Sequence, residues 1–125
     1  MLSWMRRAGC IQISYGVESG SEKIRKALGK AVKTRQIKRA FARTARYGIL
    51  SRAYLIYGAP GESWETVQET IDLMEEIKPL SAIFYILDVF PGTRVYSDLK
   101  KRHGITEEVW LKEIEGIMYF ETDST

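Results

Sequence analysis

The chain has 125 residues, of which 45% are hydrophobic, so it is long enough for one small packed domain and too apolar to be disordered throughout. Its 19 lysines and arginines against 16 aspartates and glutamates give a net charge of +3, too small to demand a nucleic-acid partner. Cys10 is the single cysteine, which excludes an internal disulfide and any multi-cysteine metal site built from this chain alone. We expect a reduced, cytoplasmic setting, because no apolar run reaches the roughly 18 residues that span a bilayer and no signal-peptide core is present.

Three strand-then-helix units follow one another along the chain. Apolar runs predict strands near residues 11–17, 52–57 and 82–90, and the third run is so uniformly apolar that we expect it to be buried on both faces. Helices are predicted over 2–8, 34–47, 63–78 and 94–102. The spacing leaves room for a crossover helix between strands, so we expect a parallel α/β sheet over 1–104, with 105–125 as a helical tail or the start of another segment.

Capping signals and apolar stripes give more detail on the helices. Ser19 and Glu22 fit a capping box for a short helix that ends near Leu28. The next helix should bury a stripe of small and apolar residues: Ile37, Ala40, Phe41, Thr44 and Ala45. Ser63 caps a further helix, whose expected inner stripe is Val67, Ile71, Met74 and Ile77, and Trp64 should pack over its own turn.

All three predicted strands end in glycine-containing turns: GVESGS, YGAPGE and DVFPGT. In parallel α/β folds, ligands bind at the carboxyl ends of the strands, and glycine lets the backbone approach a ligand closely. Glu18 can accept hydrogen bonds from two neighbouring hydroxyls, as a ribose presents them. The alternative is that these turns are structural, since similar turns occur throughout α/β proteins, and that Glu18 faces water.

Four segments in order resemble the radical S-adenosylmethionine (SAM) superfamily: AGCIQISYGVESGS, LGKAVKT, YGILSRAYLIYGAPGESWETVQETIDL and FYILDVFPGTRVYSDL. The resemblance covers roughly residues 2–99 and is closest to the branch with cobalamin-dependent members, methylthiotransferases and oxygen-independent coproporphyrinogen oxidase. It implies a (βα)3 half of a partial TIM-like (β/α)6 barrel. It also implies a parent enzyme that makes a 5′-deoxyadenosyl radical from SAM at a 4Fe-4S cluster.

The same resemblance implies SAM contacts at the three strand ends. Glu18, with Ser19 beside it, would bind the ribose, and Lys30 would reach the SAM carboxylate. Adenine contacts would come from the other two strand ends, at Ile56, Tyr57, Gly58, Val89 and Phe90. Tyr54 departs from the acidic residue or glycine that relatives carry at its position, which leaves its role open.

The cluster-binding loop CxxxCxxC of the family is absent from these residues. Thiolate ligands suit iron–sulfur chemistry, and Cys10 alone, ahead of the first predicted strand, cannot supply them. We therefore expect the chain to be part of a longer protein, to partner with the N-terminal half of its own barrel and to be inactive alone. Membership of this branch leaves room for cobalamin in that parent.

Two other functions stay open on the sequence alone. One is a stand-alone nucleotide-binding α/β module without radical chemistry. The other is a half-barrel that self-associates as a homo-oligomer through its open sheet edges, since unpaired strand edges pair readily. We expect neither membrane nor nucleic-acid binding, because the basic residues between 33 and 46 have the spacing of a solvated helix face.

Single residues that suggest chemistry have simpler structural interpretations. Cys10 is expected to be a small buried residue at a strand start. His103 precedes Gly104 at a helix end, where a cation suits the helix dipole. Apolar residues of the tail, from Trp110 to Tyr119, would pack on this domain or on a neighbouring one.

Overall fold

A computed structural model describes residues 1–104 and 106 of the chain. Its elements in order are α1 (Leu2–Arg7), β1 (Gln12–Glu18), α2 (Glu22–Ala27), α3 (Thr34–Arg46), β2 (Leu50–Tyr57), α4 (Trp64–Ile77), β3 (Ser81–Ile86) and α5 (Arg94–His103). Every helix predicted within 1–104 is therefore present. The predicted tail over 105–125, with its apolar patch, lies outside the described residues except for Thr106.

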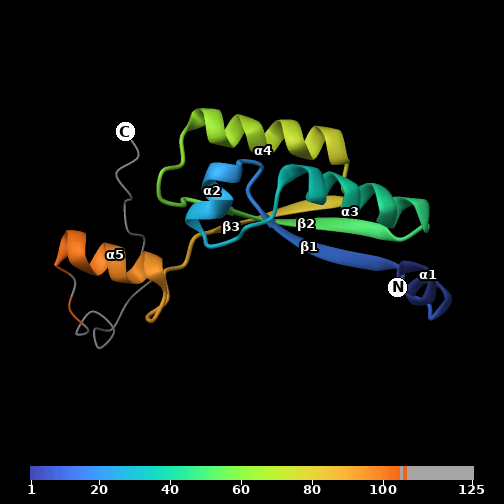
Figure 1. The fold of residues 1–125 in the computed structure, drawn as a ribbon, viewed down its shortest axis with the longest axis horizontal. Coiled ribbons are helices and arrows are strands. Elements are labelled where there is room, and N and C mark those ends of the chain that lie inside the picture. Colours follow the sequence, from blue (N-terminus) through green and yellow to red (C-terminus); the bar gives the residue numbers. More distant parts are fainter. Residues whose placement is uncertain (105, 107–125) are drawn as a thin grey trace.

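The three strands form one parallel sheet in the order β1-β2-β3, which confirms the predicted topology. Tyr15 pairs with Ala53, and Tyr54 pairs with Ile83, so all three strands run in register over most of their length. Figure 1 shows α3 and α4 over the same face of the sheet, with α1 near the start of β1. Helices α2 and α5 lie toward the other end, where the strands finish (Figure 1).

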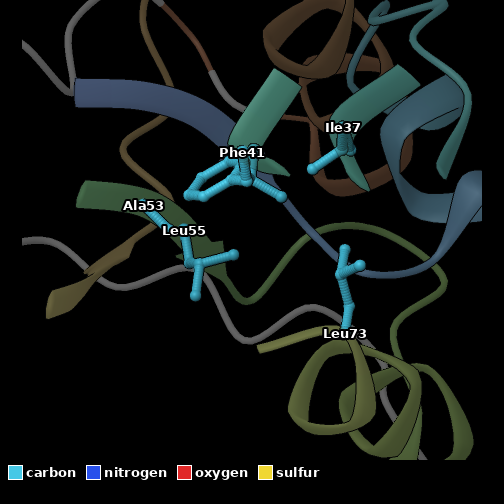
Figure 2. Packing of buried hydrophobic residues seen from close by; sticks show 6 residues of the cluster. Ile37, Phe41, Ala53, Leu55 and Leu73 are labelled. Carbon is cyan, nitrogen blue, oxygen red and sulfur yellow. The ribbon is translucent and has the colours of Figure 1, made fainter. Parts of the chain in front are cut away.

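The core fills the space between the sheet and the two helices that cover it. Four elements contribute to it: Val17 comes from β1, Ala53 and Leu55 from β2, Ile37 and Phe41 from α3, and Leu73 from α4. Figure 2 shows how Phe41 and Ile37 of α3 lie above Ala53 and Leu55 of the sheet, with Leu73 on α4. Burying one such side chain stabilises the fold by about 1.5–3 kcal/mol. Of the predicted stripe of α3, Ile37, Phe41 and Thr44 are buried and Ala40 is partly buried, whereas Ala45 is exposed, contrary to the prediction. The Thr44 hydroxyl lies 2.6 Å from the phenol oxygen of Tyr15. The outer face of α3 is exposed at its arginines, as predicted.

The inner face of α4 differs from the predicted stripe. Thr66, Thr70 and Leu73 are its buried residues. Of the predicted stripe, Met74 and Ile77 are partly buried against the core, whereas Ile71 is 44% exposed. The reason is a close approach of the β1–α2 turn, which needs small residues and hydrogen-bond acceptors on α4. Thr70 Oγ1 accepts the Gly20 N–H at 2.9 Å and donates to the Thr66 carbonyl at 3.0 Å, so its hydroxyl is satisfied in the core.

Strand β3 is shorter and more exposed than predicted. It ends at Ile86 instead of residue 90, because β2, its one neighbour within the described part of the chain, ends at Tyr57. One further bond joins the Leu87 N–H to the Tyr57 carbonyl. The prediction of burial on both faces is wrong: Phe84, Tyr85 and Ile86 are 61%, 54% and 53% exposed. Among the described residues, the core cluster contains no β3 side chain, so these three side chains lie outside the core.

Two smaller predictions also need correction. Trp64 is 85% exposed, because it occupies the first position of α4, where the inner side of the first turn is taken by Thr66. Cys10 is only partly buried, and its thiol lies 3.5 Å from the Gln12 carbonyl. Within the described part of the chain, no helix has the length and apolar character needed to cross a membrane.

The contact between Gly20 and α4 predicts a position-specific loss of stability. A Cβ added to Gly20 would lie 2.3 Å from both the Glu69 carbonyl oxygen and the Thr70 Cα, and backbone cannot move away cheaply. We expect Gly20→Ala to lower the free energy of unfolding by about 3 kcal/mol in urea denaturation followed by circular dichroism.

Gly29→Ala is the matched control for Gly20→Ala. Gly29 has a φ of 77° with nothing within 4 Å of an added Cβ, so only backbone strain of about 1 kcal/mol is expected. Equal losses in the two variants would contradict the close approach at Gly20.

Candidate functional site

The carboxyl end of β1 carries an unusual backbone. The pairing register with β2 shifts between Gly16 and Glu18, and Glu18 has a φ of 64°. Residues other than glycine rarely adopt this left-handed conformation, which costs about 1–3 kcal/mol and often occurs at functional sites. The bulge turns the Glu18 side chain toward the end of the sheet, where its carboxylate forms an ion pair with a cationic side chain.

That cation is Lys30. Its ammonium lies 2.6 Å from Glu18 Oε1 and also contacts the Gly16 carbonyl. The side chains of Lys30 and Glu18 are 33% and 21% exposed, so the pair is partly shielded from water and still accessible. Gly16 makes room for it, because a Cβ there would lie 2.7 Å from Glu18 Oε1 and 2.9 Å from Lys30 Nζ.

A cavity of about 350 Å³ opens beside the ion pair, between the strand ends and the start of α5. Its lining comprises Glu18, Lys26, Ala27, Leu28, Gly29, Lys30, Ile56, Leu87, Asp88, Thr93, Arg94 and Val95. It therefore combines charged groups of both signs with an apolar wall around Ile56. A neighbouring cavity of about 410 Å³ between α2 and α5 shares part of this lining and has a basic rim, with Lys23 and Arg102 among its own residues.

Three of the predicted site residues meet at the first cavity, namely Glu18, Lys30 and Ile56. Tyr57, Gly58, Val89 and Phe90 are absent from its lining. The Gly58 N–H donates to Glu62 Oε2 at 2.6 Å, and the Phe90 carbonyl accepts from the Thr93 hydroxyl at 2.7 Å, so both backbone groups serve local turns. Asp88 and Arg94 line the cavity and were missed, although the sequence offered a signal in the segment DVFPGT that contains Asp88.

Ser19 faces the protein interior and not the cavity. It is 1% exposed, and its hydroxyl accepts the Ser21 N–H at 3.1 Å and lies 3.3 Å from Thr70 Oγ1. The predicted capping box is therefore wrong: Ser21 is the N-cap of α2, because the bulge and the turn at Gly20 delay the first helical residue.

The carboxylate of Glu22 has another role than the predicted one. Its Oε1 accepts the Thr34 N–H at 2.8 Å, and its Oε2 lies 3.3 Å from Lys33 Nζ. These contacts connect α2 to the start of α3 across the segment that carries Lys30. The Thr34 N–H, followed by the Lys33 ammonium, lowers the pKa of Glu22 below 4.5.

On the open face of the sheet, Tyr54 lies next to a cation. The Arg52 guanidinium, followed by the Ser14 hydroxyl, lowers the pKa of the Tyr54 phenol. Arg52 Nε donates to Ser81 Oγ at 2.9 Å, and the Tyr54 ring lies 5.8 Å from the ring of Tyr85. These residues come from all three strands and form a polar, aromatic surface away from the helices.

Iron–sulfur or other metal ligation is not supported by the residues at this site. Among residues 1–104 and 106, no three His, Cys, Asp or Glu side chains are grouped to hold a metal ion. Cys10 precedes β1, and the seven residues of that strand separate it from Glu18 by roughly 20 Å.

Comparison with known proteins finds similar sequences and similar folds. The family model described as the Radical SAM superfamily matches residues 1–74. An uncharacterised methyltransferase of Pyrococcus horikoshii is 30% identical over 92 residues, which are 74% of this chain and 20% of that protein. A tRNA-2-methylthio-N(6)-dimethylallyladenosine synthase of Pelobacter propionicus is 31% identical over 87 residues, 68% of this chain and 20% of that protein. The chain spans about a fifth of the length of these two relatives.

The fold agrees with this sequence similarity. The structure of the radical SAM methyltransferase TsrM from Kitasatospora setae, with cobalamin and a 4Fe-4S cluster bound, matches with a TM-score of 0.73 at 20% identity. The match covers 81% of this chain and 20% of that one. It confirms the predicted parallel α/β architecture as part of a TIM-like barrel.

The low pKa of Glu22 predicts how stability depends on pH. Its ionised form is favoured in the folded state, so its contribution is complete above pH 4.5 and is lost as the pH falls through the lowered pKa. We expect Glu22→Gln to lower the midpoint of urea unfolding at pH 7 and to reduce the loss of stability on acidification. Glu75→Gln, on the exposed side of α4, is the control. An unchanged acid dependence in Glu22→Gln would contradict these contacts.

Proposed function

We propose that this chain, which belongs to the radical SAM superfamily, supplies one wall of a binding site for SAM. The observation that carries the proposal is the pair of Glu18 and Lys30 beside a cavity with the apolar wall of Ile56. SAM presents the matching groups: a ribose diol, an amino acid carboxylate and an adenine ring. Binding at the carboxyl ends of parallel strands is the general rule for such folds.

Glu18 is proposed to bind the ribose. A carboxylate accepts about four hydrogen bonds, so Glu18 keeps acceptor sites for both ribose hydroxyls after its contact with Lys30. The strained φ of 64° at Glu18 fixes the direction of this carboxylate before a ligand arrives. Preorganisation of this kind reduces the entropic cost of binding.

Lys30 is proposed to bind the SAM carboxylate. An ammonium has three donors, of which two contact Gly16 and Glu18 in this structure. The third donor is left for a ligand carboxylate, with which a charge-assisted hydrogen bond forms. Arg94, on the opposite side of the cavity, adds positive charge at the same ligand group.

The adenine ring is proposed to lie against Ile56. Its edge would be read by the backbone after β3, where Leu87 and Asp88 line the cavity. This assignment moves the expected contact from Val89 and Phe90 toward residues nearer the strand. Tyr57 alternates with Ile56 along β2 and is directed to the other face of the sheet, so it takes no part in this contact.

The complete enzyme is proposed to generate a 5′-deoxyadenosyl radical from SAM, with a 4Fe-4S cluster as the electron source. The ligands of that cluster must come from residues other than these 125, because the chain has only Cys10. Its own contribution is to bind and orient SAM, and we assign none of its residues to cobalamin. The N-terminal half of the barrel is the proposed partner, paired with the edge of β1 that no other described strand occupies.

Self-association of the chain is a second candidate, favoured by the exposed apolar residues of β3. Phe84, Tyr85 and Ile86 lie on an edge strand, where a second copy would both pair the backbone and cover the side chains. This function is compatible with SAM binding, since the cavity lies at the end of the sheet and not along its edge.

SAM binding is tested directly on the 125-residue chain by NMR. Titration with SAM to about 10 mM is expected to shift the backbone amide signals of Glu18, Lys30 and Ile56. Glu18→Gln is expected to weaken the affinity at least about tenfold, since it removes a charge-assisted contact to the ribose. Glu75→Gln should bind like the unmodified chain. Absence of these shifts in the unmodified chain, or equal affinities of the two variants, would count against the proposal.

The cluster assignment gives a separate prediction. After anaerobic reconstitution with iron and sulfide, the purified chain should hold no stoichiometric iron and should not cleave SAM under reducing conditions. Iron quantification and the absorbance of iron–sulfur charge transfer measure this. A stoichiometric 4Fe-4S cluster on the chain alone would show that the assignment is wrong.

A further inference from the structure

Arg25 is a fully buried cation that the proposed SAM contacts do not use. Its side chain is 0% exposed, although arginine is among the residues least often buried completely. Nε donates to the Val32 carbonyl at 2.9 Å, Nη1 to the Ser19 carbonyl at 2.5 Å, and Nη2 to the Thr34 hydroxyl at 2.6 Å. All three guanidinium nitrogens are therefore hydrogen-bonded, to acceptors that lie in two separate segments of the chain.

The charge of Arg25 is only partly compensated, by the carboxylates of Glu22 and Glu69. Its nearest carboxylate, on Glu22, is 3.8 Å away and 46% exposed, so water weakens their attraction. Burial lowers the pKa of Arg25, and arginine nevertheless stays protonated in proteins. Burying a cation is costly, and an apolar residue of similar volume often serves stability as well or better. The three directed hydrogen bonds, and not the burial, are what arginine offers here.

These bonds hold the two segments that carry the ion pair. Nη1 holds the carbonyl of Ser19, the residue after Glu18, and the Ser19 N–H donates to the Val17 carbonyl at 2.9 Å, which closes the turn around the strained Glu18. Val32 and Thr34 fix the connection that follows Lys30, and the Lys30 N–H donates to the Arg25 carbonyl at 2.8 Å. Arg25 thus anchors the backbone on both sides of the 2.6 Å contact between Glu18 and Lys30.

We infer that Arg25 is a positioning residue that sets the distance between Glu18 and Lys30 for the SAM ribose and carboxylate. The inference rests on the proposed function for its ligand, but the geometry of the ion pair can be measured without any ligand. Arg25 itself does not touch the cavity: the lining includes Lys26 to Lys30 of the same segment and omits Arg25. Its effect on binding must therefore pass through the Glu18 and Lys30 backbone.

Arg25→Met tests this role, since methionine keeps much of the side-chain volume and removes all donors. The first readout is the through-hydrogen-bond NMR coupling between the Lys30 ammonium nitrogen and the Glu18 carboxylate carbon. The second is the SAM affinity of the folded fraction. We expect the coupling to disappear and the affinity to fall about tenfold. Arg25→Lys, which keeps one charged donor group, should retain part of both signals.

Thr44→Val is the matched control for a purely structural loss. Thr44 is also 0% exposed and hydrogen-bonded, to Tyr15 and to the Ala40 carbonyl, but it lies on α3 away from the cavity. The Thr44→Val protein should be less stable but keep both the Lys30–Glu18 coupling and the affinity for SAM. If Arg25→Met keeps both readouts at the Thr44→Val level, Arg25 is structural only and the inference is overturned.

A further variant covers the case in which Arg25→Met does not fold. Thr34→Val keeps the buried cation and removes the hydroxyl that accepts from Nη2 and also contacts the Glu22 carboxylate, so it should weaken the coupling and the affinity in the same direction. An unchanged coupling in a folded Thr34→Val protein would then overturn the inference. If the unmodified chain shows the coupling and binds no SAM, the proposed function fails, while loss of the coupling in Arg25→Met still supports the positioning role.

Discussion

The hydrogen bonds of the buried Arg25 guanidinium to the Ser19 and Val32 carbonyls constrain the chain between the end of β1 and the start of α3. After β1 the chain has to leave the sheet, start a helix within a few residues and return along α3. Two backbone carbonyls in this path have no strand or helix partner, and a buried carbonyl without a donor costs about 1–3 kcal/mol. One guanidinium satisfies both, because its donors point in fixed and different directions.

Several features elsewhere depend on that turn. Its backbone approaches α4 so closely at Gly20 that the facing residues of α4 are threonines, and their hydroxyls accept and donate within the core. The same turn sets the φ of 64° at Glu18, which directs the carboxylate to the cavity and to Lys30. Packing of the helices on one face and the charge arrangement at the strand ends are thus two consequences of one local geometry.

The elements of the fold could be predicted from the sequence because each depends on a pattern within its own segment. The stripe of Ile37, Phe41 and Thr44, the glycine after α3 and the apolar strands are local signals of this kind. Predictions failed where contacts between distant segments determine where an element begins or ends, or which of its faces is buried. The start of α2 depends on a bulge opposite β2, the buried face of α4 depends on Gly20, and the end of β3 depends on where its neighbour stops.

The residues of the candidate site also fall into those that the sequence predicted and those that only the structure shows. Glu18, Lys30 and Ile56 were expected from a family resemblance that preserves order and spacing, and the structure brings these three together. Asp88 joins them because it directly follows β3, and Arg94 joins them because α5 begins beside the cavity. Arg25 gave no signal of its own in the sequence, because a basic residue on a short helix is ordinarily solvated, and its burial follows only from the acceptors that surround it.

Locating the adenosyl group of bound SAM is the most direct test of the proposal that this chain forms one wall of a SAM-binding site. Intermolecular nuclear Overhauser effects can be measured between SAM protons and methyl groups of the selectively methyl-labelled chain. If the cavity at the strand ends binds SAM, the ribose and adenine protons will show these effects with the Ile56 methyl groups. Effects confined to Leu99, in the neighbouring cavity between α2 and α5, or the absence of effects at saturating SAM, would contradict the proposed wall.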